Sequence, residues 1–152
     1  MKLSANFTLA EFTRSDAAKR LGLRNDPTPQ HLANLFKTAA GMQAVRAILG
    51  GHPINVTSAY RNPAVNKAVG GVANSDHALG WAVDFNVPAF GNPYEIALAL
   101  SRSDLVYDQL IHERKPNGSW WVHISFNPRA RQQDLTYNGK AYTSGIKPVV
   151  FK

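Results

Sequence analysis

Two histidines and an aspartate have the residue types of a metal site. His77 and Asp84 lie seven positions apart, and His123 follows much later in the chain. Two imidazole nitrogens and a carboxylate oxygen suit a zinc ion that keeps one position open for water, and such an ion lowers the pKa of water toward neutrality. Each residue alone could be an ordinary polar residue, but the set predicts one zinc ion per chain and a metal-dependent hydrolase.

Hydrolysis also needs a carboxylate that takes a proton from water and passes it to the leaving amine. Glu113 is the first choice, because strand alternation places it on one face with Gln109. Asp108 and Asp76 are the alternatives, although Asp108 belongs to the opposite face and Asp76 to a predicted loop. A solvated residue at the end of a hairpin is the competing interpretation of Glu113.

Several residues near these positions could contact a substrate. Arg61 follows a predicted strand, and its guanidinium could hold a substrate carbonyl or carboxylate and stabilise a tetrahedral intermediate. A surface ion pair is the alternative for Arg61. Ser75 could bind substrate or cap its own loop. Of the pair Trp120 and Trp121, we expect one in the core and one in a cleft wall. The full set of predicted substrate contacts is Arg61, Ser75, Tyr60, Gln109 and Trp121.

Helix signals surround these residues. Thr8-Leu-Ala-Glu11 has the form of a capping box and predicts a helix from about Leu9 to Arg20. Thr28-Pro29 opens a longer apolar periodic segment, which Gly50-Gly51 ends. Asn-Pro pairs open two further segments, a short helical turn from Asn62-Pro63 through Val69 and a helix from Asn92-Pro93 to about Ser103.

Strand signals account for the remaining positions of the site. The turn cluster Lys115–Ser119 separates two of the strand-like segments and predicts an antiparallel hairpin. If the two inner faces of that hairpin coincide, Glu113 and His123 can approach the same metal. The four expected strands are Ile54–Ala59, Trp81–Val87, Val106–Glu113 and Trp120–Phe126.

These elements predict an α+β fold with a small central antiparallel sheet, flanking helices and the zinc site on one face of the sheet. We expect His77 in a loop before the second strand. The pattern weakens after Asn127-Pro128, where Lys147–Phe151 could form a short edge strand or a docked tail. The three other histidines lack partners in the pattern, and we interpret all of them as structural: His31, His52 and His112.

Composition limits the class of protein. The 152 residues suffice for one domain, expected over 1–152, and the absence of cysteine excludes disulfides and thiolate ligands. No apolar run is long enough to cross a bilayer, and Met1–Thr8 lacks the pattern of a secretory signal, so export would need another route. The formal net charge of +7 favours a polyanionic partner. Because Lys and Arg are scattered, we rank an anionic wall or outer-membrane surface above nucleic acid.

The motif residues resemble a known group. The pattern Ser-x-His-x-x-Gly-x-Ala-x-Asp over 75–84, followed by Trp121-Val-His123, is similar to that of the zinc D-Ala-D-Ala carboxypeptidase family of murein peptidases. That family includes phage endolysins and vancomycin-resistance dipeptidases, and shares its core with hedgehog-type domains. The match also includes Ser58-Ala-Tyr-Arg61, Asn66 and Val69-Gly-Gly71, and covers roughly the central half of the chain.

The resemblance implies that His77, Asp84 and His123 bind zinc, that Arg61 contacts the substrate or transition state, and that the fold is α+β. Many members place the catalytic carboxylate three residues before the last histidine, where this chain has Trp120. However, Gln109-Leu-Ile-x-Glu113 ahead of Trp-Val-His resembles a subgroup common in phage and prophage proteins, and this favours Glu113.

The expected function is zinc-dependent hydrolysis of peptidoglycan peptides, as a D-Ala-D-Ala-type carboxypeptidase or endopeptidase. Cleavage between L-Ala and D-Glu of the stem peptide is an alternative, and a non-catalytic metal-bearing wall-binding module is another. Nucleic-acid binding lacks a motif. The size and charge resemble those of a monomeric phage endolysin that is made in the host cytoplasm and released by a holin to periplasmic peptidoglycan.

Overall fold

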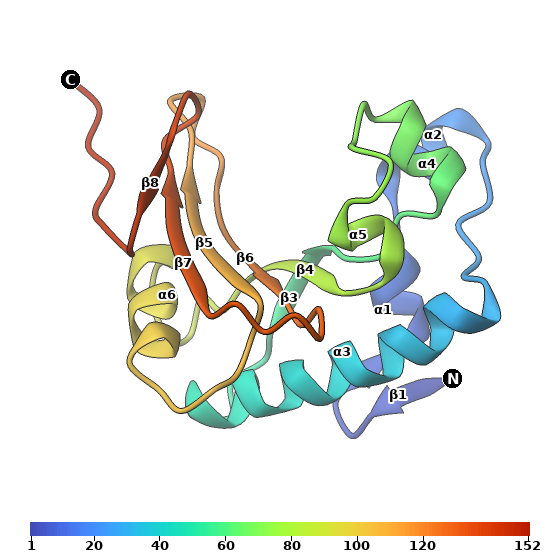
Figure 1. The fold of residues 1–152 in the computed structure, drawn as a ribbon, viewed down its shortest axis with the longest axis horizontal. Coiled ribbons are helices and arrows are strands. Elements are labelled where there is room, and N and C mark those ends of the chain that lie inside the picture. Colours follow the sequence, from blue (N-terminus) through green and yellow to red (C-terminus); the bar gives the residue numbers. More distant parts are fainter.

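A six-stranded sheet forms the centre of the computed structural model, which describes residues 1–152 (Figure 1). Neighbouring strands are antiparallel except for one parallel pair, β5 with β7. The α+β class and the predicted β5–β6 hairpin are confirmed, but the sheet is larger and more mixed than expected. Its strands lie in the order β3 (Asn55–Ser58), β4 (Ala82–Asn86), β6 (Trp120–Ser125), β5 (Gln109–Arg114), β7 (Gln133–Tyr137) and β8 (Tyr142–Ser144).

Side chains point alternately to the two sides of the sheet along its three central strands, β4, β6 and β5. One side is the core face, and we call the other the site face. Asp84 pairs with His123, and His123 pairs with Ile111 on the other side. Glu113 lies two positions from Ile111 and therefore points to the same face as His123. The predicted coincidence of the two hairpin faces is thus confirmed. The core face carries fully buried apolar side chains, which are Val83, Phe85, Leu110, Val122 and Ile124.

Two helices cover that core face. Helix α3 (Pro29–Ile48) starts as predicted, with the Thr28 hydroxyl accepting from the amide of His31. Helix α6 (Pro93–Ser101) starts at a capping box formed by Asn92 and Glu95. Their apolar stripes and the sheet form one buried cluster, in which the helices contribute Leu35, Ala39, Met42, Val45, Ile96, Ala97 and Leu100. Burial of this apolar area is the main favourable term in folding.

The N-terminal segment differs from the prediction of one continuous helix. The capping box at Thr8 is present, but helix α1 (Leu9–Thr13) ends early and α2 (Asp16–Leu21) begins anew. The chain is extended at Arg14, whose guanidinium donates to the carbonyl of Val56, and the Ser15 hydroxyl caps α2. Ser-Asp favours a new cap over helix continuation. A short hairpin of β1 (Lys2–Ser4) and β2 (Phe7–Thr8) precedes α1 and was not predicted.

Residues after 126 contain structure that the weak sequence pattern did not indicate. Strands β7 and β8 extend the sheet, because polar strands gain their stability from neighbouring strands more than from intrinsic preference. Of the two alternatives for Lys147–Phe151, the structure has the docked tail. His112 Nδ1 donates to the carbonyl of Lys147 at 2.8 Å, and Arg114 donates to that of Val149 at 3.2 Å.

His112 is buried on the core face, as predicted for a packing residue. Its Nε2 accepts from the Trp120 indole at 2.8 Å, so both ring nitrogens of the neutral imidazole are satisfied. Burial lowers the pKa of His112 and favours this neutral form. No helix of the fold combines the length and the hydropathy that crossing a membrane requires.

The turn that leads from β6 to β7 is held by a buried carboxylate. Asp108, whose side chain is 0% exposed, accepts from Arg131 Nε at 2.9 Å and from Arg129 at 3.0 Å. The same turn contains two non-glycine residues with positive φ, Ala130 at 45° and Gln132 at 54°. Such conformations cost about 1–2 kcal/mol each. The ion pairs offset this cost and bring β7 alongside β5.

Asp108 should therefore make stability sensitive to acid. Although burial acts in the opposite direction, the arginines lower its pKa below the value expected in the unfolded chain. The contribution is present above the unfolded pKa of about 4 and is lost as pH falls below it. We expect Asp108→Asn to cost about 2 kcal/mol at pH 7 and much less at pH 3. Urea unfolding in EDTA measures this, and the exposed Asp104→Asn is the matched control.

Candidate metal centre

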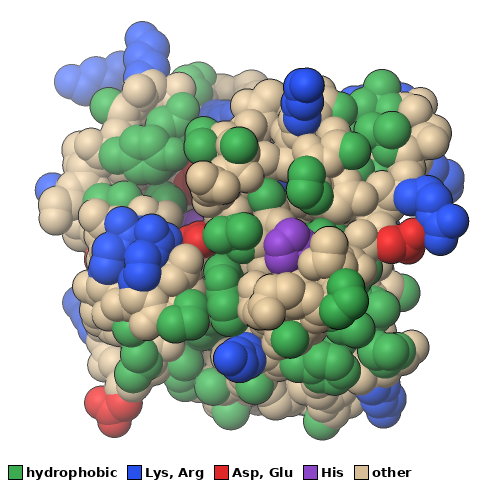
Figure 2. Space-filling view, turned by 45° about the vertical axis from the view of Figure 1, so that its right-hand side comes forward, with side chains coloured by type: hydrophobic (Ala, Val, Ile, Leu, Met, Phe, Trp, Pro, Cys, Tyr) green, Lys and Arg blue, Asp and Glu red, His purple; other side chains and the backbone are tan.

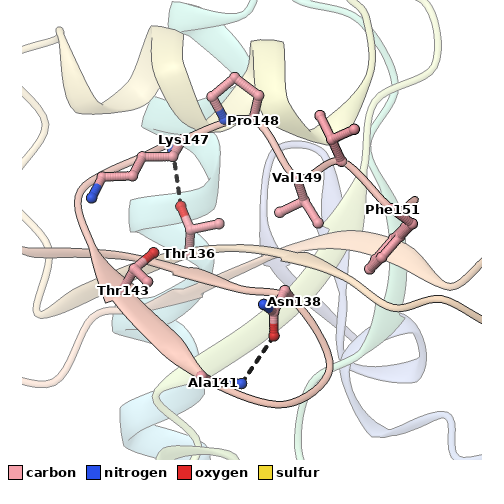
Figure 3. Close-up of a pocket in the computed structure, with 9 residues that line it drawn as sticks. Thr136, Asn138, Ala141, Thr143, Lys147, Pro148, Val149 and Phe151 are labelled. Atoms are coloured by element: carbon pink, nitrogen blue, oxygen red, sulfur yellow. Dashed lines mark hydrogen bonds between the residues drawn. The ribbon is translucent and has the colours of Figure 1, made fainter.

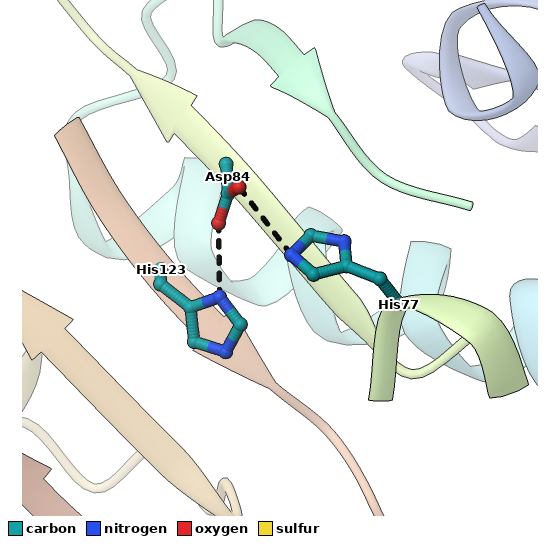
Figure 4. Close-up of side chains that lie close together, drawn as sticks. All are labelled: His77, Asp84 and His123. Carbon is teal, nitrogen blue, oxygen red and sulfur yellow. Dashed lines mark hydrogen bonds and ion pairs between the residues drawn. The ribbon is translucent and has the colours of Figure 1, made fainter. Parts of the chain in front are cut away.

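His77, Asp84 and His123 lie together on the site face (Figure 4). Asp84 Oδ2 is 3.3 Å from His77 Nε2, and Asp84 Oδ1 is 2.9 Å from His123 Nδ1. One ligand atom from each of the three residues lies within 4.8 Å of the others. Ligand atoms of a tetrahedral zinc ion, at about 2.0–2.1 Å from the metal, are separated by about 3.3 Å. The cluster can therefore hold one metal ion with little rearrangement.

His77 comes from a single helical turn, α5 (Asp76–Leu79), and not from the predicted loop. The Ser75 hydroxyl caps this turn by accepting from Ala78 N at 3.2 Å. Gly80 ends it with φ at 87°, and an added Cβ there would lie 3.0 Å from the carbonyl oxygen of His31. So short a helix cannot persist by itself, which explains why local sequence signals did not reveal it.

The orientation of His77 is fixed by the end of β3. Its Nδ1 lies 2.6 Å from the carbonyl oxygen of Ala59, so that nitrogen carries the proton and donates. The lone pair is then on Nε2, the atom that faces Asp84. The amide of Arg61 donates back to the carbonyl of His77 at 3.2 Å. The bond of Nδ1 leaves Nε2 free as a ligand, as is usual for metal-binding histidines, and the backbone bond holds α5 beside Arg61.

The charge on Asp84 suits a metal ligand. Its side chain is only 16% exposed, and burial alone would raise its pKa. The charges and hydrogen bonds of His77 and His123 outweigh burial and hold the pKa of Asp84 well below its usual range. Burial acts to lower the pKa of His123, but Asp84 and then Glu113 raise it overall. A positive charge is thus favoured at this position in the fold.

Glu113 lies diagonally across the β5–β6 pair from His123, because its direct partner is Trp121. Diagonal neighbours in an antiparallel pair are about 7–8 Å apart and within reach of long side chains. Glu113 is buried, and its carboxylate takes part in no ion pair. Burial raises its pKa to about 7, with Asp84 adding to the rise and His123 opposing it. Such a pKa suits a general base.

The two alternative carboxylates are engaged elsewhere. Asp108 is paired with Arg129 and Arg131, as described above. Asp76 accepts from the Ser125 hydroxyl at 2.6 Å and from Arg129 at 3.3 Å. It also accepts from the side-chain amide of Asn127 at 3.0 Å. Neither carboxylate is free to exchange a proton with water unless these partners are first lost.

Asp76 and its partners form a clamp that the sequence did not indicate, which we define as Asp76, Ser125, Asn127 and Arg129. Ser125 and Asn127 follow His123 along the chain, whereas Asp76 directly precedes His77. The clamp therefore fixes the helical turn carrying one ligand against the end of the strand carrying another. Only the position of Asp76 beside His77 could have pointed to it.

Arg61 is half-buried beside the metal cluster. Its Nε is buried and has no hydrogen-bond partner. Burial lowers the pKa of Arg61, and the charge of Asp84 partly opposes this. The surface ion pair that was the alternative interpretation is absent. An unpaired N–H on a cation at this position is suited to an oxygen of a bound molecule.

Not all of the other predicted substrate contacts lie at the site. Trp121 lies on the site face next to Glu113, and Trp120 packs on the other face against His112. Ser75 caps α5, and its hydroxyl also donates to Asn66 at 3.3 Å. Gln109 lies at the rim, where its side-chain amide donates to Gln133. Tyr60 is fully buried, and its hydroxyl lies 2.8 Å from His31 Nδ1.

Tyr60 is a correction to the expected substrate contacts. Its side chain is 0% exposed and belongs to the hydrophobic core. A substrate in the site therefore has no surface of Tyr60 to touch, and the residue packs beneath the site. The bond between Tyr60 and His31 also gives His31 the structural role that was expected of it.

Comparisons with known proteins agree with this geometry. The family model described as Peptidase M15 matches residues 5–125. The zinc D-Ala-D-Ala carboxypeptidase of Streptomyces albus G is 35% identical over 120 residues, which make up 79% of this chain and 45% of that protein. The chain thus spans about half the length of this relative. Strands β7 and β8 and the C-terminal tail lie beyond the residues that the family model matches.

Removal of one ligand should abolish metal binding without unfolding the chain. We expect wild type to bind one zinc ion, and Asp84→Ala to bind none in a competition titration against a chromogenic chelator, because two imidazoles alone leave the site incomplete. His52→Ala is the matched control, since His52 lies far from the cluster in a loop after α3. Stoichiometric zinc binding by Asp84→Ala would exclude this site.

The clamp should increase the affinity for metal although none of its residues is a predicted ligand. Arg129→Met removes a donor to Asp76, and we expect zinc to bind about tenfold more weakly because α5 is held less firmly. Lys140→Met, an exposed substitution in the β7–β8 turn, should leave affinity unchanged. The same titration measures both. Equal affinities in a folded Arg129→Met would show that the clamp does not position His77.

Proposed function

Because this chain belongs to the M15 family of peptidases, we propose that it is a zinc-dependent peptidase acting on peptide bonds of bacterial peptidoglycan. One observation carries the proposal: Asp84 and His123 share a sheet face with Glu113, a carboxyl that is free of ion pairs, and His77 on α5 completes the candidate metal cluster. The arrangement combines a metal site with a general base, which are the two parts that hydrolysis of a peptide needs.

A zinc ion bound by His77, Asp84 and His123 supplies Lewis acidity and lowers the pKa of water. Glu113 accepts the proton that the attacking water loses, and then donates it to the nitrogen of the leaving amine. Its raised pKa supports both roles, since a group that titrates near neutrality can accept and release a proton at the working pH.

Arg61 would stabilise the negative charge that develops on the substrate during the reaction. Its side chain is only half-buried, so the guanidinium can meet an oxygen of the substrate, and its Nε–H has no partner within the chain. During attack on a carbonyl, negative charge develops on that oxygen, and a fixed cation stabilises it most where water is excluded. Ser75 and the clamp maintain the position of His77, and Trp121 contributes a wall beside Glu113.

The bond that is cut is the finer part of the proposal. The relative from Streptomyces is a D-Ala-D-Ala carboxypeptidase, which supports cleavage between D-amino acids at the end of a stem peptide or in a cross-link. Cleavage between L-Ala and D-Glu stays the alternative. A wall-binding module without turnover is less well supported, because such a module would have no use for an unpaired carboxyl beside its metal.

An endolysin-like role in bacterial lysis, at the periplasmic peptidoglycan and after release by a holin, is part of the same proposal. The net charge of +7 supports attraction to an anionic wall or outer-membrane surface. Lys and Arg side chains are scattered over the visible face and are not gathered in one patch (Figure 2), which speaks against a nucleic-acid groove. The monomeric state stays a prediction.

Digestion of purified sacculi tests the activity and the bond together. We expect zinc-loaded wild type to release muropeptides with new amino termini, and mass spectrometry of these products identifies the bond. Glu113→Gln should lose about 10²–10⁴-fold in rate while still binding zinc. Glu95→Gln, an exposed capping position on α6, is the matched control. Tight binding to sacculi without products would instead favour a binding module.

The pH profile tests the proton-transfer role of Glu113. The carboxylate must be ionised to accept a proton, so kcat/KM should fall as pH decreases through its pKa. That pKa is about 7 without metal, and a bound cation lowers it, so the acid limb should lie at or below pH 7. An identical limb in the residual activity of Glu113→Gln would assign the base to another group, such as Asp108 or Asp76.

A further inference from the structure

A row of side chains crosses four strands at the level of Glu113. Trp121 on β6 pairs with Glu113 on β5, and Glu113 pairs with Tyr137 on β7. Tyr137 in turn pairs with Tyr142 on β8. Directly paired residues point to the same face of a sheet, so all four side chains lie on the site face. The proposed base therefore has an aromatic neighbour on each side.

Tyr142 is the outermost and most exposed member of this row. Its ring stacks on Tyr137 with 4.5 Å between ring centroids and a tilt of 31°. The residue is nevertheless 57% exposed, so one face of the ring and its edge remain open. Tyrosine combines an apolar ring with a polar hydroxyl, and such side chains are enriched at binding interfaces.

The charges of the site affect the pKa of the Tyr142 hydroxyl. Burial raises its pKa first, and the charges of Glu113, Tyr137 and Asp84 raise it further. Two of these groups belong to the strands at the centre of the sheet, in keeping with the place of Tyr142 on the site face. The hydroxyl stays protonated at neutral pH and can donate a hydrogen bond to an acceptor on that face.

The reverse face of β8 has a different role. Thr143 and Thr136 point there and line a pocket that the C-terminal tail closes (Figure 3). Thr136 Oγ1 accepts from the amide of Lys147 at 2.9 Å, which seats the tail. The tail thus forms part of the lining on this side of β8. The exposed aromatic surface of β8 belongs to the site face, and β8 offers a matched position, Thr143, on the other.

We propose that Tyr142 is a substrate-binding residue, whose hydroxyl donates a hydrogen bond to a carbonyl or carboxylate oxygen of the peptide while Tyr137 holds its ring. This inference rests on the proposed peptidase function. A peptide that reaches from Arg61 past Glu113 offers an acceptor oxygen at every residue. Strands β7 and β8 lie beyond residues 5–125, which the family model matches, so this contact is argued from the structure of this chain alone.

Three variants test the proposal with a muropeptide that wild type cleaves. Tyr142→Phe keeps the ring and removes the hydroxyl, so we expect KM to rise about threefold to tenfold with kcat within about twofold of wild type. Tyr142→Leu also removes the stacked ring and should raise KM further. Thr143→Val should change neither constant. Thermal unfolding of each variant checks that the β7–β8 hairpin is intact.

Binding in a Glu113→Gln background separates the possible outcomes. Weaker binding of the uncleaved muropeptide by the added Tyr142→Phe change supports the proposal. Unchanged binding and KM in Tyr142→Phe would overturn it, and would do so even if Tyr142→Leu were impaired, since the ring alone would then matter. If wild type neither binds nor cleaves muropeptides, the peptidase proposal fails and the role of Tyr142 fails with it. If wild type cleaves muropeptides and Tyr142→Phe changes neither binding nor KM, the Tyr142 proposal fails and the peptidase proposal stands.

Discussion

The carboxylate of Asp84 lies between the imidazoles of His77 and His123, and the rest of the site depends on this contact. An ionised carboxylate that is largely removed from water costs several kcal/mol unless positive charge compensates it. The fold supplies the two rings at 3.3 and 2.9 Å and leaves a geometry that one metal ion can occupy. Each ring has its own support, since Ala59 holds His77 and the β4–β6 register holds His123.

Two carboxyl groups on one sheet face have pKa values that their surroundings shift in opposite directions. Asp84 is kept ionised by the two histidines, whereas burial without an ion-pair partner raises the pKa of Glu113 to about 7. Divergent pKa values of neighbouring acids are typical of a division of labour between a charged ligand and a group that exchanges protons. The engagement of Asp76 and Asp108 with arginines leaves Glu113 as the available proton acceptor.

The residues after 125 contribute to the site although the family model does not reach them. Arg129 connects Asp76, next to a metal-binding residue, with Asp108, which fixes the path into β7. The same path carries Tyr137 beside Glu113 and Tyr142 beyond it. One ion-pair network thus positions a helical turn at the metal and the outer wall of the proposed substrate cleft.

Residue types and local spacing in the sequence were sufficient for the metal-binding set, the helix caps at Thr8, Thr28 and Asn92, and the division of the central strands into two faces. These features depend on neighbours within a few positions, where side-chain periodicity and capping act. The break at Arg14 and the helical turn under His77 escaped prediction, because short helices are decided by what they pack against. Only the tertiary structure determined the parallel pairing of β7 with β5, the engagement of Asp76, the burial of Tyr60 and the place of Tyr142 on the site face. Strand order and register are set by contacts between residues far apart in sequence, and no local pattern encodes which distant strand lies next to Glu113.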